Sequence, residues 1–109
     1  MNAGVVMIYT IDEIKEKIKP IAKKYDVVGI YLFGSYARGE ADENSDVDIA
    51  IVKGDTDYIY DYFYTFKEEL ETVFCLKFDI LFSEDVHVPI GKFENRFALK
   101  YERDKLKVV

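Results

Sequence analysis

The first regular pattern of apolar and polar positions predicts an amphipathic helix over residues 11–25. Thr10 and Glu13 have the spacing of a capping box, in which each side chain bonds to the other residue's backbone N–H at a helix start. Pro20 lies inside the pattern and predicts a kink or a break, because proline has no backbone N–H to donate. The apolar stripe consists of Ile11, Ile14, Ile18, Ala22 and Tyr25, with Ile21 at its margin.

Three short apolar segments rich in β-branched and aromatic residues predict strands at 27–33, 47–52 and 76–82. The second strand should turn Val47, Ile49 and Ile51 to one face of the sheet and Asp48 and Ala50 to the other. Further elements are predicted as a helical turn at 35–39, helices at about 56–73 and 90–102, and an edge strand at 105–109. The buried stripe of the helix at 56–73 is predicted as Ile59, Tyr62, Phe63, Phe66, Leu70 and Val73.

This order of elements predicts a small α/β (α+β) fold, in which helices pack on a mixed β-sheet. The chain has 109 residues, enough for a single domain over 1–109, and its 50% hydrophobic content excludes a disordered chain. Residues 1–9 carry no periodic pattern, so we expect them to be disordered or to form an edge segment.

The charge and cysteine content limit the location and the partners. With 15 Lys and Arg against 21 Asp and Glu, the net charge of −6 gives no attraction for a phosphate backbone, so nucleic acid is an unlikely partner. No apolar run is long enough for a membrane span, and the first residues lack the pattern of a signal peptide.

Cys75 has no second cysteine to pair with, which indicates the cytoplasm, and we expect it to be a small buried residue. His87 has no second His or Cys nearby, so a zinc site is not expected.

Two carboxylates at the start of the second strand are the first candidates for chemistry. Asp46 and Asp48 project from the same face, with Cα atoms about 6.5 Å apart. Such carboxylates repel each other unless a cation lies between them, and oxygen ligands suit Mg²⁺. An isolated Asp-x-Asp is more often a strand cap and an exposed residue. Asp48, however, lies in an apolar strand, where an unpaired charge is costly.

Asp79 lies in the middle of the third apolar strand, on the same face as Lys77 and Leu81. If the second and third strands are neighbours, its carboxylate can reach the pair at 46 and 48. The alternative is a structural ion pair with Lys77 or another lysine.

Gly34 and Ser35 follow the first strand and open a helical turn. This geometry can point backbone N–H groups at a phosphate, which a glycine allows to approach closely and a serine hydroxyl can bond. Alone, a Gly-Ser pair after a strand is usually a turn. Here it stands eleven residues before Asp46, so it can form the other half of a site for a metal-bound nucleoside triphosphate.

The spaced motif resembles the signature of the DNA polymerase β-like nucleotidyltransferase superfamily, and it reads Gly34-Ser35, then Asp46-Val47-Asp48-Ile49. The chain length, the Ala-Arg-Gly after Gly-Ser and the serine before the first aspartate are similar to the minimal nucleotidyltransferase (MNT) family. The resemblance covers about residues 10–103, because the leading helix and the later Phe-Asp-Ile strand also lie where that family has them. It implies the polymerase β-like nucleotidyltransferase fold.

The resemblance also implies a reaction, the transfer of a nucleotidyl group from ATP with release of pyrophosphate. Asp46, Asp48 and Asp79 would be the catalytic carboxylates and would bind two Mg²⁺ ions, with Asp79 helping to deprotonate the acceptor hydroxyl. Gly34 and Ser35 would hold the β- and γ-phosphates.

Two further residues of the motif are candidates for nucleotide binding. Arg38 would steady the triphosphate, and the alternative is a surface ion pair with Glu40 or Asp42. Ser45 is expected to cap the strand and to orient Asp46.

The acceptor is implied by the resemblance alone. Larger relatives carry an extra domain for the acceptor, for which this chain has no room. The MNT resemblance implies a HEPN-domain ribonuclease toxin as partner, and transfer of AMP to one of its tyrosines as a protein adenylyltransferase antitoxin. Two alternatives stay open: an antitoxin that neutralises by binding alone, and a catalytic subunit that modifies a small hydroxylated molecule.

The segment from Tyr58 to Tyr64 contains four tyrosines and offers a possible docking surface for the partner. Tyr60 and Tyr64 are neighbours on one flank of the predicted stripe, and Tyr58 lies on the other flank. Exposed tyrosines are frequent at interfaces. The alternative is that they cover the margin of a small core.

Overall fold

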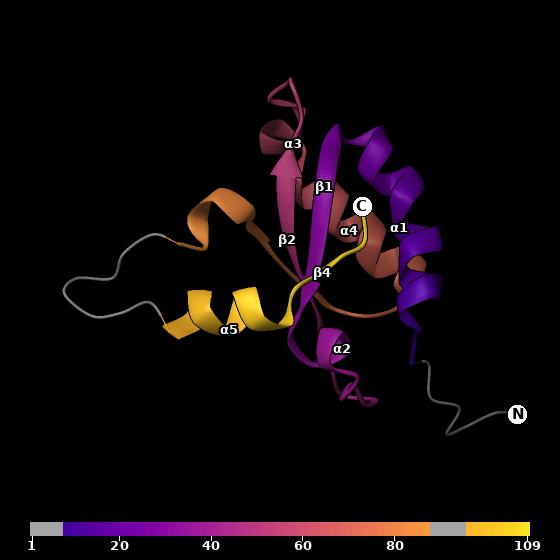
Figure 1. The fold of residues 1–109 in the computed structure, drawn as a ribbon. Helices are drawn as coiled ribbons and strands as arrows, with labels where there is room; N and C mark the ends of the chain where they lie inside the picture. Colours follow the sequence, from indigo (N-terminus) through magenta and orange to yellow (C-terminus); the bar gives the residue numbers. More distant parts are fainter. Residues whose placement is uncertain (1–7, 88–95) are drawn as a thin grey trace, which may run out of the picture.

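The computed structural model of the chain describes residues 8–87 and 96–109, and its centre is a four-stranded mixed sheet with the order β3-β2-β1-β4 (Figure 1). β1 (Val27–Phe33) pairs antiparallel with β2 (Val47–Lys53) and with β4 (Leu106–Lys107). β2 pairs parallel with β3 (Phe78–Phe82). The predicted α/β fold and the predicted edge strand near the end of the chain are both confirmed.

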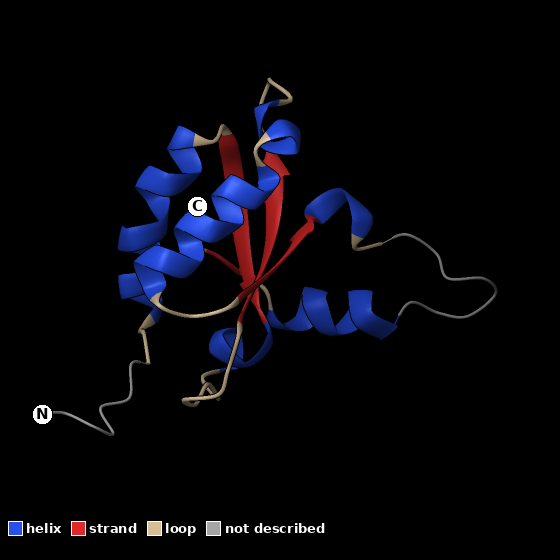
Figure 2. Cartoon of the chain, turned by 180° about the vertical axis from the view of Figure 1, so that it is seen from behind, coloured by secondary structure: helices blue, strands red, loops and turns tan. Residues whose placement is uncertain are grey.

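Helices cover both faces of the sheet. α1 (Ile11–Lys24) and α4 (Phe63–Phe74) pack on one face, and α5 (Arg96–Asp104) lies with the turn η1 (Ser83–Asp85) on the other side (Figure 2). The larger core faces α1 and α4 and includes Val47, Ile49 and Ile51, as strand alternation predicts. A smaller core beneath α5 consists of Phe33, Ala50, Val86, Ala98 and Tyr101. No helix in the described ranges is long and apolar enough to cross a membrane.

The capping box at the start of α1 is confirmed. The Glu13 N–H donates to Thr10 Oγ1 over 3.1 Å, and the Thr10 N–H donates to Glu13 Oε1 over 2.8 Å. The break predicted at Pro20 does not occur, because Ile18 and Ile21 are both buried and hold that part of α1 against the sheet.

Within the predicted segment 1–9, residues 1–7 lie outside the described residues, and Tyr9 belongs to the core. Its hydroxyl donates to the Phe74 carbonyl over 2.8 Å, and the two rings pack edge to face with centroids 5.1 Å apart. The chain is therefore ordered before the first residue of α1.

The helix predicted at 56–73 is two helices, α3 (Tyr58–Asp61) and α4, joined at Tyr62. This break shifts the buried face of α4, so Tyr62 and Val73 are exposed and Phe74 is buried, contrary to the predicted stripe. Cys75 is also exposed, because it ends α4 in a left-handed conformation with φ of 55°.

Near α5, residues 90–95 of the helix predicted at 90–102 lie outside the described ranges, and α5 continues to Asp104. His87 Nε2 lies 2.9 Å from Glu102 Oε1, so this side chain connects the segment after η1 to α5.

The tyrosine-rich segment lies at the opposite end of the sheet from α2 (Gly34–Arg38) (Figure 1). Asp48 and Lys53 are five positions apart in β2, which is about 16 Å along a strand. The rings of Tyr58 and Tyr62 stack with centroids 4.4 Å apart, and Tyr60 packs on Phe82 at 5.2 Å. These three tyrosines cover the margin of the core, whereas Tyr64 is 82% exposed.

We expect Tyr60→Ala to lower the free energy of unfolding by about 1 kcal/mol, because it removes the contact with Phe82 and the hydrogen bond to Glu84. Tyr64→Ala is the matched control from the same segment and should change stability by less than about 0.5 kcal/mol. Urea unfolding of both variants measures the difference. Equal effects would contradict a core-margin role for Tyr60.

Candidate active site

The candidate site begins with two carboxylates on neighbouring strands. The parallel register of β2 and β3 places Asp48 directly beside Asp79. Residues two apart on a strand share a face, so both aspartates lie on the face of Ala50 and Leu81, beneath α5. Asp79 forms no ion pair with a lysine in the described part of the chain, so the alternative of a structural pair with Lys77 is not what the structure has.

The surroundings of Asp48 disfavour its ionised form. Partial burial, followed by the charge of Asp79 and a hydrogen bond with it, raises the pKa of Asp48 to about 6. The charge of Asp46 adds to this rise in pKa, and the Arg38 guanidinium opposes it. Three of the other predicted residues therefore act electrostatically on Asp48.

Gly34 allows Asp48 to occupy its position. The backbone of Gly34 has φ of +72°, and a Cβ built there would collide with Asp48 Oδ2. A glycine is required on both grounds. The structure thus gives this glycine one reason, room for the Asp48 carboxylate, and its role in phosphate binding stays a prediction.

The loop before β2 holds Asp46 and Ser45. Asp46 is exposed just before the strand. The Ser45 hydroxyl accepts the Asp42 N–H over 2.8 Å and donates to Asp42 Oδ1 over 3.2 Å, so it shapes the loop instead of orienting Asp46. The Ser35 hydroxyl, at the start of α2, makes no hydrogen bond within the described residues.

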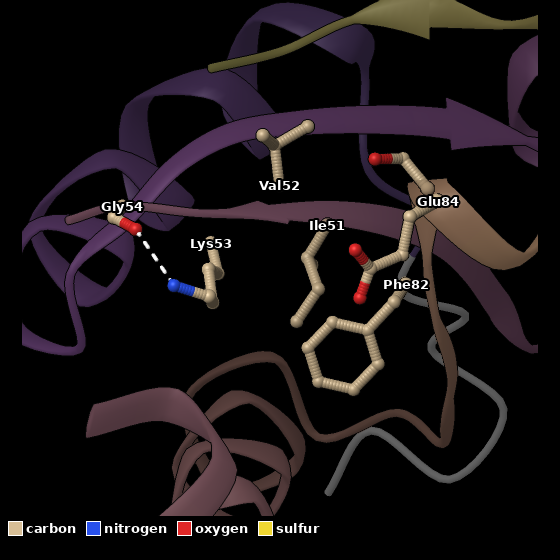
Figure 3. A pocket seen from close by; sticks show the side chains of 7 residues that line it. Ile51, Val52, Lys53, Gly54, Phe82 and Glu84 are labelled. Carbon is tan, nitrogen blue, oxygen red and sulfur yellow. Dashed lines mark hydrogen bonds between the residues drawn. The ribbon is translucent and has the colours of Figure 1, made fainter. Parts of the chain in front are cut away.

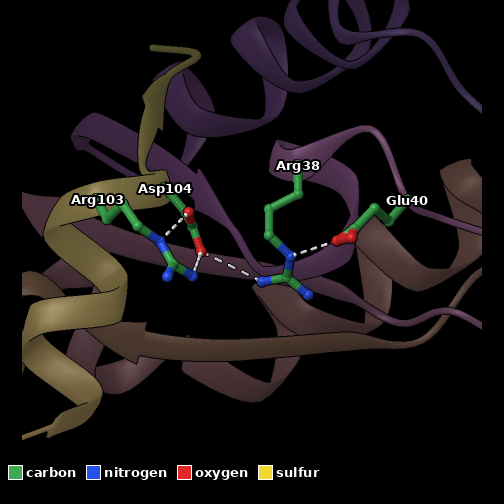
Figure 4. A network of polar contacts seen from close by, with 4 residues as sticks. All are labelled: Arg38, Glu40, Arg103 and Asp104. Carbon is green, nitrogen blue, oxygen red and sulfur yellow. Dashed lines mark hydrogen bonds and ion pairs between the residues drawn. The ribbon is translucent and has the colours of Figure 1, made fainter.

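Arg38 joins α2 to α5 through a network of charges (Figure 4). Its Nε donates to Glu40 Oε1 over 2.9 Å, the ion pair that was the alternative to a nucleotide-binding role, and its Nη1 donates to Asp104 Oδ2 over 3.3 Å. Arg103 also binds Asp104, through Nε over 2.8 Å and Nη2 over 3.0 Å. These hydrogen bonds lower the pKa of Asp104 and fix the guanidinium of Arg38 beside the candidate site.

A pocket of about 260 Å³ lies between these elements and α5. Its first wall is formed by Phe33, Gly34, Arg38 and Asp48, and α5 supplies the opposite wall of Phe97, Lys100, Tyr101 and Asp104. The sequence interpretation missed the four residues of α5. Their spacing of i, i+3, i+4 and i+7 places them on one helical face and was the available signal.

A second pocket of about 260 Å³ lies at the other end of β2 and β3 (Figure 3). Its lysine, Lys53, already bonds the carbonyls of Gly54 and Thr56 and lies 3.2 Å from Asp57. Its carboxylate, Glu84, accepts the Tyr60 hydroxyl over 3.1 Å. Because these polar groups are engaged within the protein, the pocket at Asp48 is the better candidate.

Comparison with known proteins identifies the family of the chain. Residues 16–97 match the family model described as "Polymerase beta, Nucleotidyltransferase". The chain belongs to the polymerase β nucleotidyltransferase family.

Two relatives from Methanocaldococcus jannaschii, each named "Putative protein adenylyltransferase", are 42% identical to the chain. The first aligns over 88 residues, 76% of this chain and 88% of the relative, and the second over 77 residues, 71% and 82%.

Two solved structures share the fold. One, described as "Crystal structure of the toxin-antitoxin with AMP-PNP", has a TM-score of 0.63 and 21% identity over 87% of this chain and 72% of that chain. The other, described as "Structure of putative minimal nucleotidyltransferase", has a TM-score of 0.64 and 22% identity over 90% of this chain and 95% of that chain.

The donor atoms of the site fit a hard divalent cation. Asp48 and Asp79 offer adjacent oxygen ligands whose mutual repulsion a cation would relieve, and Asp46 offers a third at the strand start. Within residues 8–87 and 96–109, no group of three or more His, Cys, Asp or Glu side chains is arranged to hold an ion by itself. Mg²⁺ commonly needs only one or two carboxylates, together with water and substrate phosphates.

We expect Asp48→Asn to stabilise the metal-free protein at about pH 8 by about 1 kcal/mol, after allowing for solvent screening of a carboxylate that is only partly buried. The raised pKa of Asp48 means that protonation favours the fold. This stability is present below the ordinary pKa near 4 and is lost as the pH rises through about 6. The gain should therefore be small at about pH 4.

Chemical unfolding at both pH values, with a chelator present, measures this effect. Asp46→Asn is the control, because Asp46 is exposed and should change stability by less than about 0.5 kcal/mol. A gain of equal size at both pH values would contradict the assigned cause.

We expect Gly34→Ala to destabilise the protein by about 2 kcal/mol or more, because the positive φ and the collision with Asp48 both cost energy. Gly39→Ala is a matched control, since Gly39 has φ of +73° and no atom within 4 Å of an added Cβ. The control should lose only about 1–2 kcal/mol. Thermal unfolding compares the two, and an equal loss would show that Asp48 does not depend on the glycine.

Proposed function

We propose that this nucleotidyltransferase is a Mg²⁺-dependent protein adenylyltransferase that transfers AMP from ATP to a tyrosine of a HEPN-domain ribonuclease toxin, and so acts as its antitoxin. The observation that carries the proposal is the adjacent pair Asp48 and Asp79, with Gly34 against it and Arg38 beside it. Relatives named as protein adenylyltransferases and a fold neighbour described as a toxin–antitoxin complex with AMP-PNP support the choice of acceptor and nucleotide.

The chain's own residues would place the nucleotide and the acceptor. Arg38 offers its guanidinium at the pocket wall, and Gly34 and Ser35 offer backbone and hydroxyl donors for the phosphates. Asp79 is exposed, so it can take the proton from an acceptor hydroxyl as that oxygen bonds to the α-phosphorus and pyrophosphate leaves. Asp46, Asp48 and Asp79 would hold Mg²⁺, which supplies charge that stabilises the attacking and leaving oxygens.

The acidic charge of the chain suits a basic partner. A net charge of −6 favours association with a ribonuclease that carries a positive surface for RNA. Because the acceptor must reach the pocket between α2 and α5, we place the docking surface at that end of the sheet. The tyrosine-rich segment lies at the other end.

Neutralisation by binding alone is the weaker alternative. A protein that only covered its partner would gain nothing from adjacent carboxylates that raise the pKa of Asp48 and oppose its ionisation. Their presence in a small sheet is better explained by a reaction that uses them.

Labelled ATP tests the proposal directly. With Mg²⁺ and the product of the neighbouring gene, which the proposal expects to be a HEPN-domain protein, we expect label from the α-phosphate to appear on a tyrosine of that protein. Label from the γ-phosphate should leave with pyrophosphate. Tight binding of the partner without label would favour neutralisation by binding, and label on neither protein would favour a small-molecule acceptor.

The double substitution Asp46→Asn with Asp48→Asn should reduce transfer at least a hundredfold, on the order expected when charge stabilisation in the transition state is lost. Asp42→Asn is the control, because Asp42 bonds only within its own loop and should keep transfer within about twofold. Full transfer by the double variant would contradict the assigned carboxylates.

A further inference from the structure

One face of α5 contributes side chains of different chemistry to the candidate site. Asp104 holds Arg38, Tyr101 is buried in the small core, and Phe97 and Lys100 remain exposed along the pocket. The pocket therefore has a polar part at Gly34, Asp48 and Arg38 and an aromatic part on α5.

Phe97 is an exposed ring that the protein nevertheless orients. It lies edge to face on Phe33 with centroids 5.6 Å apart, and it is stacked with Tyr101 at 6.4 Å. Both of these supporting rings are buried, whereas Phe97 is 42% exposed. A ring that is held in place and still open to solvent can receive a second flat ring without rearranging.

Lys100 lies one helical turn after Phe97 and lines the same pocket. Within the described residues its ammonium group forms no ion pair, unlike Arg38, whose guanidinium is shared between Glu40 and Asp104. A cation without a protein partner beside the proposed phosphate donors is suited to an anionic group of the ligand.

We infer that Phe97 stacks on the nucleobase of the bound nucleotide and that Lys100 contacts its phosphates, so that α5 forms the nucleobase subsite. This inference rests on the proposed function, because it takes the pocket to be the nucleotide site. Among the described residues, none of the side chains that line the pocket is an Asn, Gln, Ser or Thr that would read the edge of a base. Stacking tolerates any base and grows with ring area, so we expect ATP and GTP to bind alike and CTP to bind more weakly.

Equilibrium binding of two probes in the presence of Mg²⁺ separates the base from the phosphates. ATP carries both groups, and inorganic tripolyphosphate carries only the phosphates. Phe97→Ala should lower the affinity for ATP roughly tenfold or more, which is the loss typical of a stacked base. It should leave the affinity for tripolyphosphate unchanged. Phe97→Trp should restore ATP binding, and Lys100→Ala should lower the affinity for both probes.

Leu99→Ala is the matched control, since Leu99 is an exposed apolar residue of α5 that does not line the pocket. It should bind both probes as the unmodified protein does. Unchanged ATP affinity in Phe97→Ala, or a parallel loss of ATP and tripolyphosphate in a folded variant, would overturn the inference. Because this measurement records binding without transfer, its failure is distinct from failure of the labelled-ATP experiment.

Discussion

Two carboxylates lie side by side on neighbouring parallel strands, and the rest of the site is arranged around their repulsion. The register of β2 and β3 aligns Asp48 with Asp79, and partial burial together with the charge of Asp79 raises the pKa of Asp48. The glycine that begins α2 gives the Asp48 carboxylate its space. A cation is the simplest ligand that would make this arrangement favourable.

The position of these carboxylates also departs from a common rule of α/β proteins. Ligands usually bind at the carboxyl ends of parallel strands. In this sheet the corresponding position is the pocket near Lys53 and Glu84, where the polar groups already bond to the protein. The candidate site instead lies near the amino ends of β2 and β3, next to the carboxyl end of the antiparallel β1, where the chain turns into α2.

The parts of the structure that depend on local sequence were predictable. The capping box of Thr10 and Glu13, the strand of Asp48 and the turn at Gly34 follow from spacing and residue type. Cys75 was not predictable in the same way. Its exposure depends on where α4 ends and on a left-handed backbone conformation that cysteine rarely adopts.

The parts that depend on contacts distant in sequence were only partly predictable. Strand alternation indicated that Asp79 could reach Asp46 and Asp48 if the second and third strands were neighbours, and the sheet order supplied that condition. The bond between Arg38 and Asp104, and the wall formed by α5, required knowledge of which face of the sheet the last helix covers. Helical spacing identifies which residues share a face of a helix, but it does not identify the part of the protein against which that face packs.

Asp79 has a consequence for solubility as well as for chemistry. β3 is an edge strand of the sheet in the described structure, and apart from this residue it consists of Phe, Ile, Leu and Phe. An apolar edge strand without a charge is a template for pairing with another chain and for aggregation. The exposed carboxylate interrupts that template, so the residue proposed to accept a proton would also protect the open edge of the sheet from self-association.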